Sequence, residues 1–275
     1  MDATLGIIAG ITSGLFFALK DVYSKKAITQ KGLENALFYI YFLAWLPVAL
    51  YFLLFDYKAF SASDLQLGGF VGLGLTLGYF LFFKAMESGK ISLVGPVSEL
   101  WVLFTVIAAF FVLGEKISFN QTIGLVLSFV ALFILSDRGK TDSKSVFYAF
   151  AAAVVWGFSW FTVKPLVDSV GTFGAYFLYV GVGVVLFFLY AVFSKKLAKP
   201  GKIFLIPAFL LVLAYLVEVW GVGLSTVSLV SIAYSPSYIL SVIVLTRLML
   251  GEKLKKIHYA GIALILTAIT LIALG

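Results

Sequence analysis

The sequence predicts an all-α integral membrane protein with ten transmembrane helices, arranged as two inverted five-helix repeats. Hydrophobic residues make up 62% of the chain and charged residues only 12%, whereas soluble domains carry about 25% charged residues. The hydrophobic residues gather in ten long runs, and parts of the first half recur in the second. Composition, run length and repetition together indicate this fold class.

Ten apolar runs are long enough to cross a bilayer. A hydrocarbon core about 30 Å thick takes roughly 20 helical residues to span. Short polar breaks such as Asp56-Tyr57-Lys58 separate the runs, and the runs are continuous rather than alternating, which argues against a transmembrane β-barrel. The predicted helices are 4–24, 34–55, 66–87, 91–113, 119–136, 145–165, 172–193, 203–224, 228–250 and 257–274.

The basic residues predict the orientation of these helices. Ten crossings put both termini on one side and the odd-numbered connections on the other. Of the 20 Lys and Arg residues, only Lys58, Lys116 and Lys164 fall on the side of the termini. Cytoplasmic connections carry the excess of basic residues. The sequence therefore predicts a multi-pass protein of the cell membrane with both termini outside.

The chain divides into a first repeat, 1–138, and a second repeat, 139–275, that form one structural unit. The Leu-Gly-Glu-Lys sequence of residues 113–116 recurs at 250–253, and Gly124 recurs as Gly261. Because five is an odd number of crossings, the second copy must enter the membrane upside down. Small residues at every fourth position predict close helix packing; they are Gly6, Gly10, Gly14, Gly68, Gly72, Gly74, Gly78, Ala149, Ala153 and Gly157.

Three sets of residues resemble a known family. They are Trp156-Gly157-Phe158-Ser159 in the sixth helix, the Gly-Glu-Lys sequence after the fourth and ninth helices, and Gly124 with Gly261. In this order they resemble the ten-helix EamA-type branch of the drug/metabolite transporter superfamily, over essentially the whole chain. The resemblance implies alternating access without nucleotide hydrolysis. It also implies a central cavity between helices 1, 3, 4, 6, 8 and 9.

Four of the charged residues inside predicted helices are candidates for a functional role: Glu99, Glu218, Lys20 and Asp21. A charged side chain at the bilayer centre costs about 2.5–3.5 kcal/mol on insertion scales, so it normally faces a cavity or a partner. We expect Glu99 and Glu218 to bind a cationic group or to couple transport to a proton; the alternative is a structural ion pair or a protonated acid. We expect Lys20 and Asp21 to be coupling groups or charge partners, with Lys20 as the ion-pair partner of Glu99. Snorkelling of Lys20 to the interface is the alternative.

Aromatic residues accompany these acids on the helices expected to surround the cavity. Aromatic faces beside carboxylates suit an ammonium group, although most aromatic side chains in such a chain pack or face lipid. Pro96 and Pro236 are expected to break the fourth and ninth helices near the site, with simple kinks as the alternative. The predicted substrate-binding residues are Tyr79, Glu99, Trp101, Trp156, Trp160, Tyr215, Glu218, Tyr234 and Tyr238.

The function that these observations favour is secondary transport of a small cationic or zwitterionic metabolite, amino acid or drug-like amine, coupled to a proton or cation. Membrane lipid and a second copy in a homodimer are the other partners considered. The sequence has one His, no Cys, no phosphate-binding loop and no Gly-x-Ser-x-Gly motif. We therefore expect no cofactor, no metal, no nucleic acid and no enzymatic activity. A non-transporting receptor or scaffold, and a membrane enzyme acting on a lipid carrier, are the alternatives.

Overall fold

A computed structural model describes residues 3–113, 118–135, 140–225 and 227–274. Within these ranges the chain forms α-helices and one 3₁₀ turn, and no strand. The first half contains α1 (Ala3–Lys31), α2 (Leu33–Phe55), α3 (Ala62–Ser88), α4 (Ile91–Ser98), α5 (Trp101–Leu113) and α6 (Phe119–Leu135). The second half contains α7 (Lys140–Trp160), α8 (Val163–Phe193), η1 (Lys202–Phe204), α9 (Leu205–Leu224), α10 (Val227–Leu250) and α11 (Lys256–Leu274).

The helices are those of a multi-pass membrane protein. Six described segments are long and apolar enough to cross a bilayer, and three more apolar helical segments, 91–105, 119–135 and 256–272, are shorter. The helix α7 adds 21 residues, about 31 Å of helix. Since α4 and α5 together occupy the fourth predicted span, the all-α membrane fold with ten crossings is confirmed.

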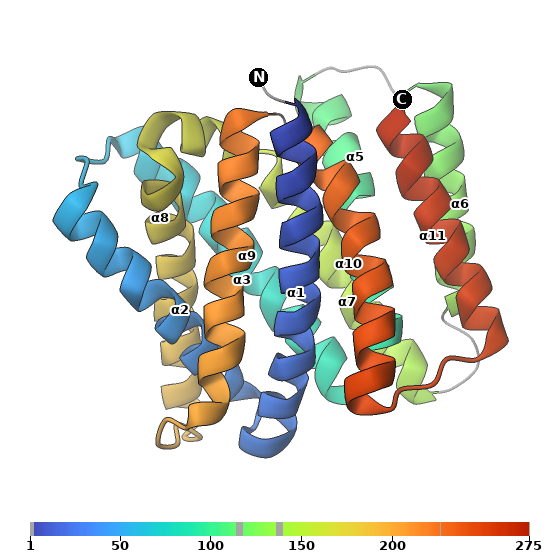
Figure 1. The fold of residues 1–275 in the computed structure, drawn as a ribbon, viewed down its shortest axis with the longest axis horizontal. Coiled ribbons are helices and arrows are strands. Elements are labelled where there is room, and N and C mark those ends of the chain that lie inside the picture. Colours follow the sequence, from blue (N-terminus) through green and yellow to red (C-terminus); the bar gives the residue numbers. More distant parts are fainter. Residues whose placement is uncertain (1–2, 114–117, 136–139, 226, 275) are drawn as a thin grey trace.

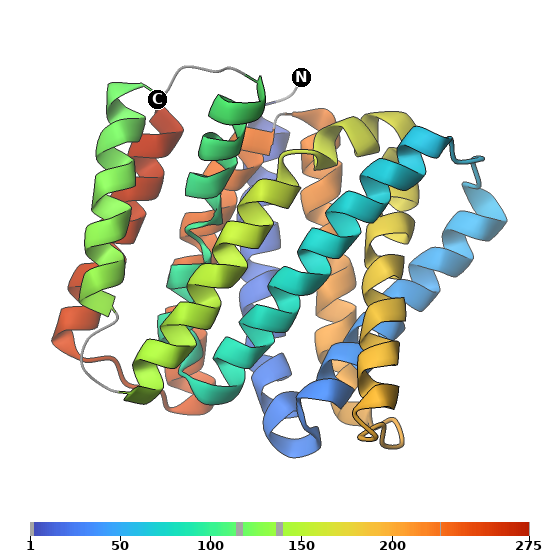
Figure 2. The same ribbon diagram turned by 180° about the vertical axis from the view of Figure 1, so that it is seen from behind.

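The two halves run in opposite directions. Both ends of the chain lie at the same edge of the helical bundle (Figure 1). The helix α1 runs away from that edge, whereas α7, the first helix of the second half, runs towards it (Figure 2). Five crossings in each half produce this reversal. The predicted boundary between Arg138 and Gly139 lies outside the described residues.

The halves interleave instead of packing side by side. The helix α1 packs against α9 and α10 of the second half, and α7 packs in the same way against α3 and α5 of the first. Two further pairs, α2 with α8 and α6 with α11, join equivalent helices of the two halves. Exchanging the halves thus reproduces the same set of neighbours, and every helix near the centre contacts the opposite half.

The predicted small-residue seams are places of close helix contact. A Cβ atom added to Gly10 would lie 2.4 Å from the carbonyl oxygen of Val230 in α10. A Cβ atom on Gly78 would lie 2.2 Å from the indole nitrogen of Trp156 in α7. These distances are too short for any added side-chain atom, so glycine fits at both positions. Small residues of this kind let the backbones of two membrane helices approach each other closely.

Several predicted helix ends and breaks differ from the structure. The first helix was predicted to end at 24, but α1 continues to Lys31. The sixth helix ends at Trp160 rather than at 165, and an unpredicted helical segment, 163–170, forms the first part of α8 before the predicted start at 172. Gly171 has φ +77° and separates residues 163–170 from the long part of α8, since a left-handed residue cannot continue an α-helix. The predicted break at Pro236 is wrong, because α10 continues through it. Packing against neighbouring helices makes proline tolerable inside membrane helices.

Candidate functional site

The fourth crossing is broken at Glu99. The helix α4 ends at Ser98 and α5 begins at Trp101. Around the break the backbone makes short-range hydrogen bonds, from Leu100 N to Val97 O at 3.2 Å and from Leu103 N to Leu100 O at 3.0 Å. These three-residue turns replace the regular four-residue pattern of the α-helix. A break in this helix was predicted at Pro96, and it lies three residues further along the chain.

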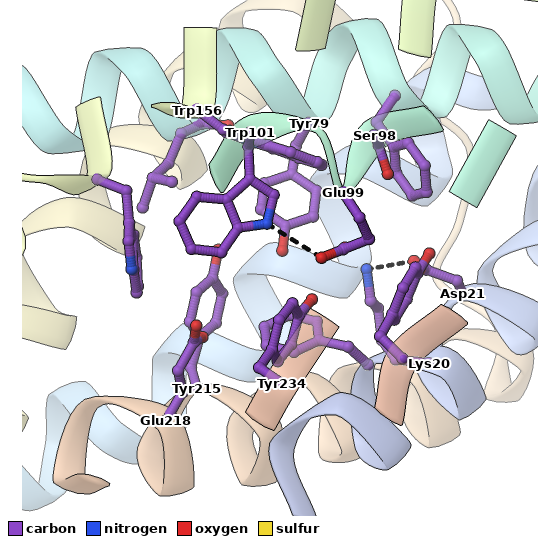
Figure 3. A pocket seen from close by; sticks show the side chains of 15 residues that line it. Lys20, Asp21, Tyr79, Ser98, Glu99, Trp101, Trp156, Tyr215, Glu218 and Tyr234 are labelled. Atoms are coloured by element: carbon purple, nitrogen blue, oxygen red, sulfur yellow. Dashed lines mark hydrogen bonds and ion pairs between the residues drawn. The ribbon is translucent and has the colours of Figure 1, made fainter. Parts of the chain in front are cut away.

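A pocket lies beside this break, between α1, α3, α4, α5, α7, α9 and α10 (Figure 3). The space between its lining atoms, open solvent included, is about 490 Å³. All nine predicted substrate-binding residues and both predicted charge partners line it. The lining residues are Phe17, Lys20, Asp21, Leu75, Tyr79, Phe82, Ser98, Glu99, Trp101, Trp156, Trp160, Tyr215, Glu218, Tyr234 and Tyr238.

Four lining residues were not predicted. Phe17 lies three residues before Lys20, and Phe82 lies three residues after Tyr79, so each shares a helix face with a predicted residue. Helical spacing from the predicted residues was therefore a signal for both. Leu75 and Ser98 carry no comparable signal, because a single Leu or Ser in an apolar helix has many equivalents in this sequence.

Glu99 is buried and is held by residues of both halves. Its side chain is 2% exposed. The carboxylate accepts hydrogen bonds from Ser235 Oγ of α10 at 2.6 Å and from Trp101 Nε1 of α5 at 3.1 Å. Among the described residues no Lys or Arg forms an ion pair with Glu99. The hydrogen bonds fix the direction of the carboxylate and leave its charge without a basic partner.

Lys20 pairs with Asp21 and not with Glu99. The two side chains form an ion pair in which Lys20 is 1% exposed, and Asp21 also accepts a hydrogen bond from Tyr238 Oη at 2.8 Å. The expected Lys20–Glu99 ion pair and the snorkelling alternative are therefore both wrong. Since α1 continues to Lys31, Lys20 lies about 16 Å along the helix from its end, too far for its side chain to reach the interface.

Aromatic rings form most of the pocket wall. The Lys20 ammonium lies 4.9 Å from the centroid of the Tyr79 ring, within the range of a cation–π contact. The rings of Tyr234 and Tyr238 are stacked with centroids 5.9 Å apart, and Trp101 meets Trp160 edge-on at 6.3 Å. Three carboxyl groups and one ammonium group share this wall. The wall therefore combines ionisable groups with aromatic surface.

A second layer of tyrosines supports the pocket from behind. Tyr176 and Tyr179 of α8 pack edge-on against the Tyr215 ring, with centroids 5.9 and 5.5 Å away. Tyr41 of α2 packs against Tyr79 at 5.3 Å. Within the described part of the chain, the buried hydroxyls of Tyr41, Tyr176 and Tyr179 have no hydrogen-bond partner. The sequence reasoning missed this layer, because no charge or motif marks it.

The fold and the pocket together define the class of protein. Two interleaved halves of opposite direction surround a pocket at a broken helix, and this is the architecture of transporters built from inverted repeats. The model of the EamA-like transporter family matches residues 4–137 and, a second time, residues 143–274. The chain belongs to this family.

The known proteins that are similar to the chain include one transporter and one solved structure. An uncharacterized transporter of Archaeoglobus fulgidus is 24% identical over 171 residues, which are 60% of each chain. The matched region thus spans about 60% of the length of that curated relative. One solved crystal structure of a protein matches with a TM-score of 0.65 and 18% identity, covering 97% of this chain and 94% of the other. At that identity the likeness concerns the fold alone.

Proposed function

We propose that the protein is a secondary transporter that moves a small organic cation or zwitterion across the cell membrane by alternating access. The observation that carries this proposal is Glu99, a buried carboxylate without a basic partner among the described residues, placed at a helix break between the two halves. A charge in such a position is expensive unless a cation or a proton compensates it. Binding and release of that cation is the function that this position fits.

The pocket walls define the expected substrate chemistry. An ammonium group placed near Glu99 and Glu218 gains charge compensation, and the rings of Trp101, Trp156 and Tyr234 contact the organic body. Amines, amino acids and drug-like amines share these features. When no substrate is bound, a proton on Glu99 compensates the same charge, so the carboxylate also suits proton coupling. The Lys20–Asp21 ion pair is the internal charge partner of the site.

Alternating access follows from the way in which the halves share the pocket. The helices α1, α3, α4 and α5 belong to the first half, and α7, α9 and α10 to the second. A rocking movement of one half against the other exposes a pocket of this kind first to one face and then to the other. No side chain has to cross the membrane in such a movement.

A ligand screen on the purified protein tests the substrate class. We expect amines or amino acids to raise the unfolding temperature in detergent, because a ligand at about 100 times its Kd stabilises the folded state by about 2.7 kcal/mol. Uncharged sugars serve as the matched negative set. Stabilisation by sugars together with no response to any cation would contradict the proposed role of the carboxylates.

The orientation is a separate prediction that rests on the distribution of Lys and Arg. We expect a reporter fused after Gly275 to give an extracellular signal, because the basic connections belong to the cytoplasmic side. The same reporter inserted in the 195–202 connection, which is rich in lysine, is the internal control and should report the cytoplasm. A cytoplasmic signal from the C-terminal fusion would show that the charge-based orientation is wrong.

A further inference from the structure

The repeated Gly-Glu-Lys sequence has a contact outside the pocket. Glu252 lies between α10 and α11, and its carboxylate accepts hydrogen bonds from Ile91 N at 3.1 Å, Ser92 N at 2.9 Å and Ser92 Oγ at 2.6 Å. These are the first residues of α4. The first N–H groups of a helix have no partner within it, and a negative charge is favourable there. The second half therefore caps a helix of the first half.

The other residues of the sequence support this cap. Gly251 has φ +66°, a conformation that favours glycine, and it turns the chain after α10 so that Glu252 reaches α4. Lys90, the residue before α4, makes no side-chain cap of its own. Its ammonium instead donates a hydrogen bond to Lys253 O at 2.9 Å. Two contacts thus attach the connection between α10 and α11 to the start of α4.

The capped helix leads directly to Glu99. The helix α4 has 8 residues and Glu99 follows its last residue, so the cap lies about 12 Å from the break. The eight residues of α4 form the direct covalent link between the cap and Glu99. A displacement of its capped end therefore moves the carboxylate of Glu99 relative to Ser235 and Trp101.

The cap lies towards the end of the pocket where the lining residues are most deeply buried. Between cap and pocket, Met86 and Val94 are fully buried, and Lys25 Nζ donates a hydrogen bond to Gly89 O at 3.0 Å to join α1 to the end of α3. Lining residues nearest this end are hardly exposed, with Phe82 at 1%. Towards the face of the termini, Trp160 keeps 5% and Tyr234 8% exposure.

We propose that Glu252 is a positioning residue: its capping contact with α4 holds the pocket closed on the face of the α10–α11 connection, and this contact breaks when the pocket opens to that face. The inference rests on the proposed alternating access. It assigns a mechanical role to a sequence that lies outside the binding pocket.

The absence of cysteine from the chain provides a direct test. Ser98→Cys places one thiol in the pocket, and a membrane-impermeant thiol reagent is added to one side of oriented vesicles at a time. We expect the parent thiol to react from the face of the termini. Adding Glu252→Ala should raise the rate at which the thiol is modified from the opposite face about tenfold. This effect lies within the usual range of coupling between sites. Glu252→Gln keeps an acceptor oxygen and should raise it less.

Glu87→Ala is the matched control, because Glu87 is an exposed acid at the end of α3 that pairs with Lys84 at 3.1 Å; it should leave the rate unchanged. Size-exclusion profiles identify folded variants, and Glu252→Gln takes the place of Glu252→Ala if the latter misfolds. The inference is overturned if the folded variants show no rise in the rate of thiol modification from the opposite face. The same holds if no reaction from that face occurs at all. Because no substrate is needed, a negative ligand screen does not affect this result, whereas equal access from both faces in the parent contradicts alternating access itself.

Discussion

Replacing Glu99 by Gln is expected to weaken binding of a cationic ligand by about thirtyfold or more and to stop its flux into liposomes. Gln has nearly the same shape and keeps an oxygen that accepts from Ser235 or Trp101, so the wall of the pocket is retained while the charge is lost. Removing one partner of a buried charge pair costs about 2–5 kcal/mol, and about 2 kcal/mol corresponds to roughly thirtyfold in Kd. Titration of the purified variant with the best ligand of the screen measures the change.

Two results separate this reading from its alternatives. Glu87→Gln removes an exposed carboxylate and should leave both affinity and flux unchanged. If Glu99→Gln binds the cation as tightly as the parent does, the carboxylate has the structural role considered as an alternative. A receptor or scaffold predicts something different, namely ligand binding without flux even in the parent protein.

The helices were predictable where polar residues mark their ends, except that α1 continues through Ser24-Lys25-Lys26 to Lys31. The second helix was expected at 34–55 and α2 runs from Leu33 to Phe55, because Lys-Gly precedes it and Asp-Tyr-Lys follows it. The sixth helix was not bounded in this way. Residues 161–163 remain apolar or weakly polar, so hydropathy gives no sign of the turn after Trp160. The long part of α8 begins after Gly171, where the seventh helix was predicted to begin.

The lining of the pocket was predictable because ionisable residues are rare in membrane helices. Glu99 and Glu218 stood out by position, and helical spacing identified the aromatic residues near them. The partners of these groups were not predictable. Lys20 has two acids to choose from, and only the packing of α1 against α10 brings Tyr238 and Asp21 together. The contact of Glu252 with Ser92 joins residues 160 positions apart, and no local pattern encodes it.

Replacing Gly157 by Ala is expected to lower the free energy of unfolding by about 1–3 kcal/mol, the usual effect of overpacking a tight contact. The added Cβ atom would lie 2.3 Å from Phe104 Cβ and 2.5 Å from the carbonyl oxygen of Trp101. Neither atom can move by rotating a side chain, because one is a backbone atom and the other is attached directly to the backbone. The helix α5 must therefore shift away from α7.

Such a shift also reaches the pocket, since Trp101 donates the hydrogen bond to Glu99. Unfolding of the purified protein by SDS measures the stability, and Gly69→Ala is the matched control, because a Cβ atom there meets nothing within 4 Å. We expect Gly157→Ala to lose both stability and ligand affinity and Gly69→Ala to lose neither. Equal stability of the two variants would mean that α5 and α7 are not held at the distance the structure gives. In that case the glycine of the Trp-Gly-Phe-Ser sequence would be explained by something other than helix packing.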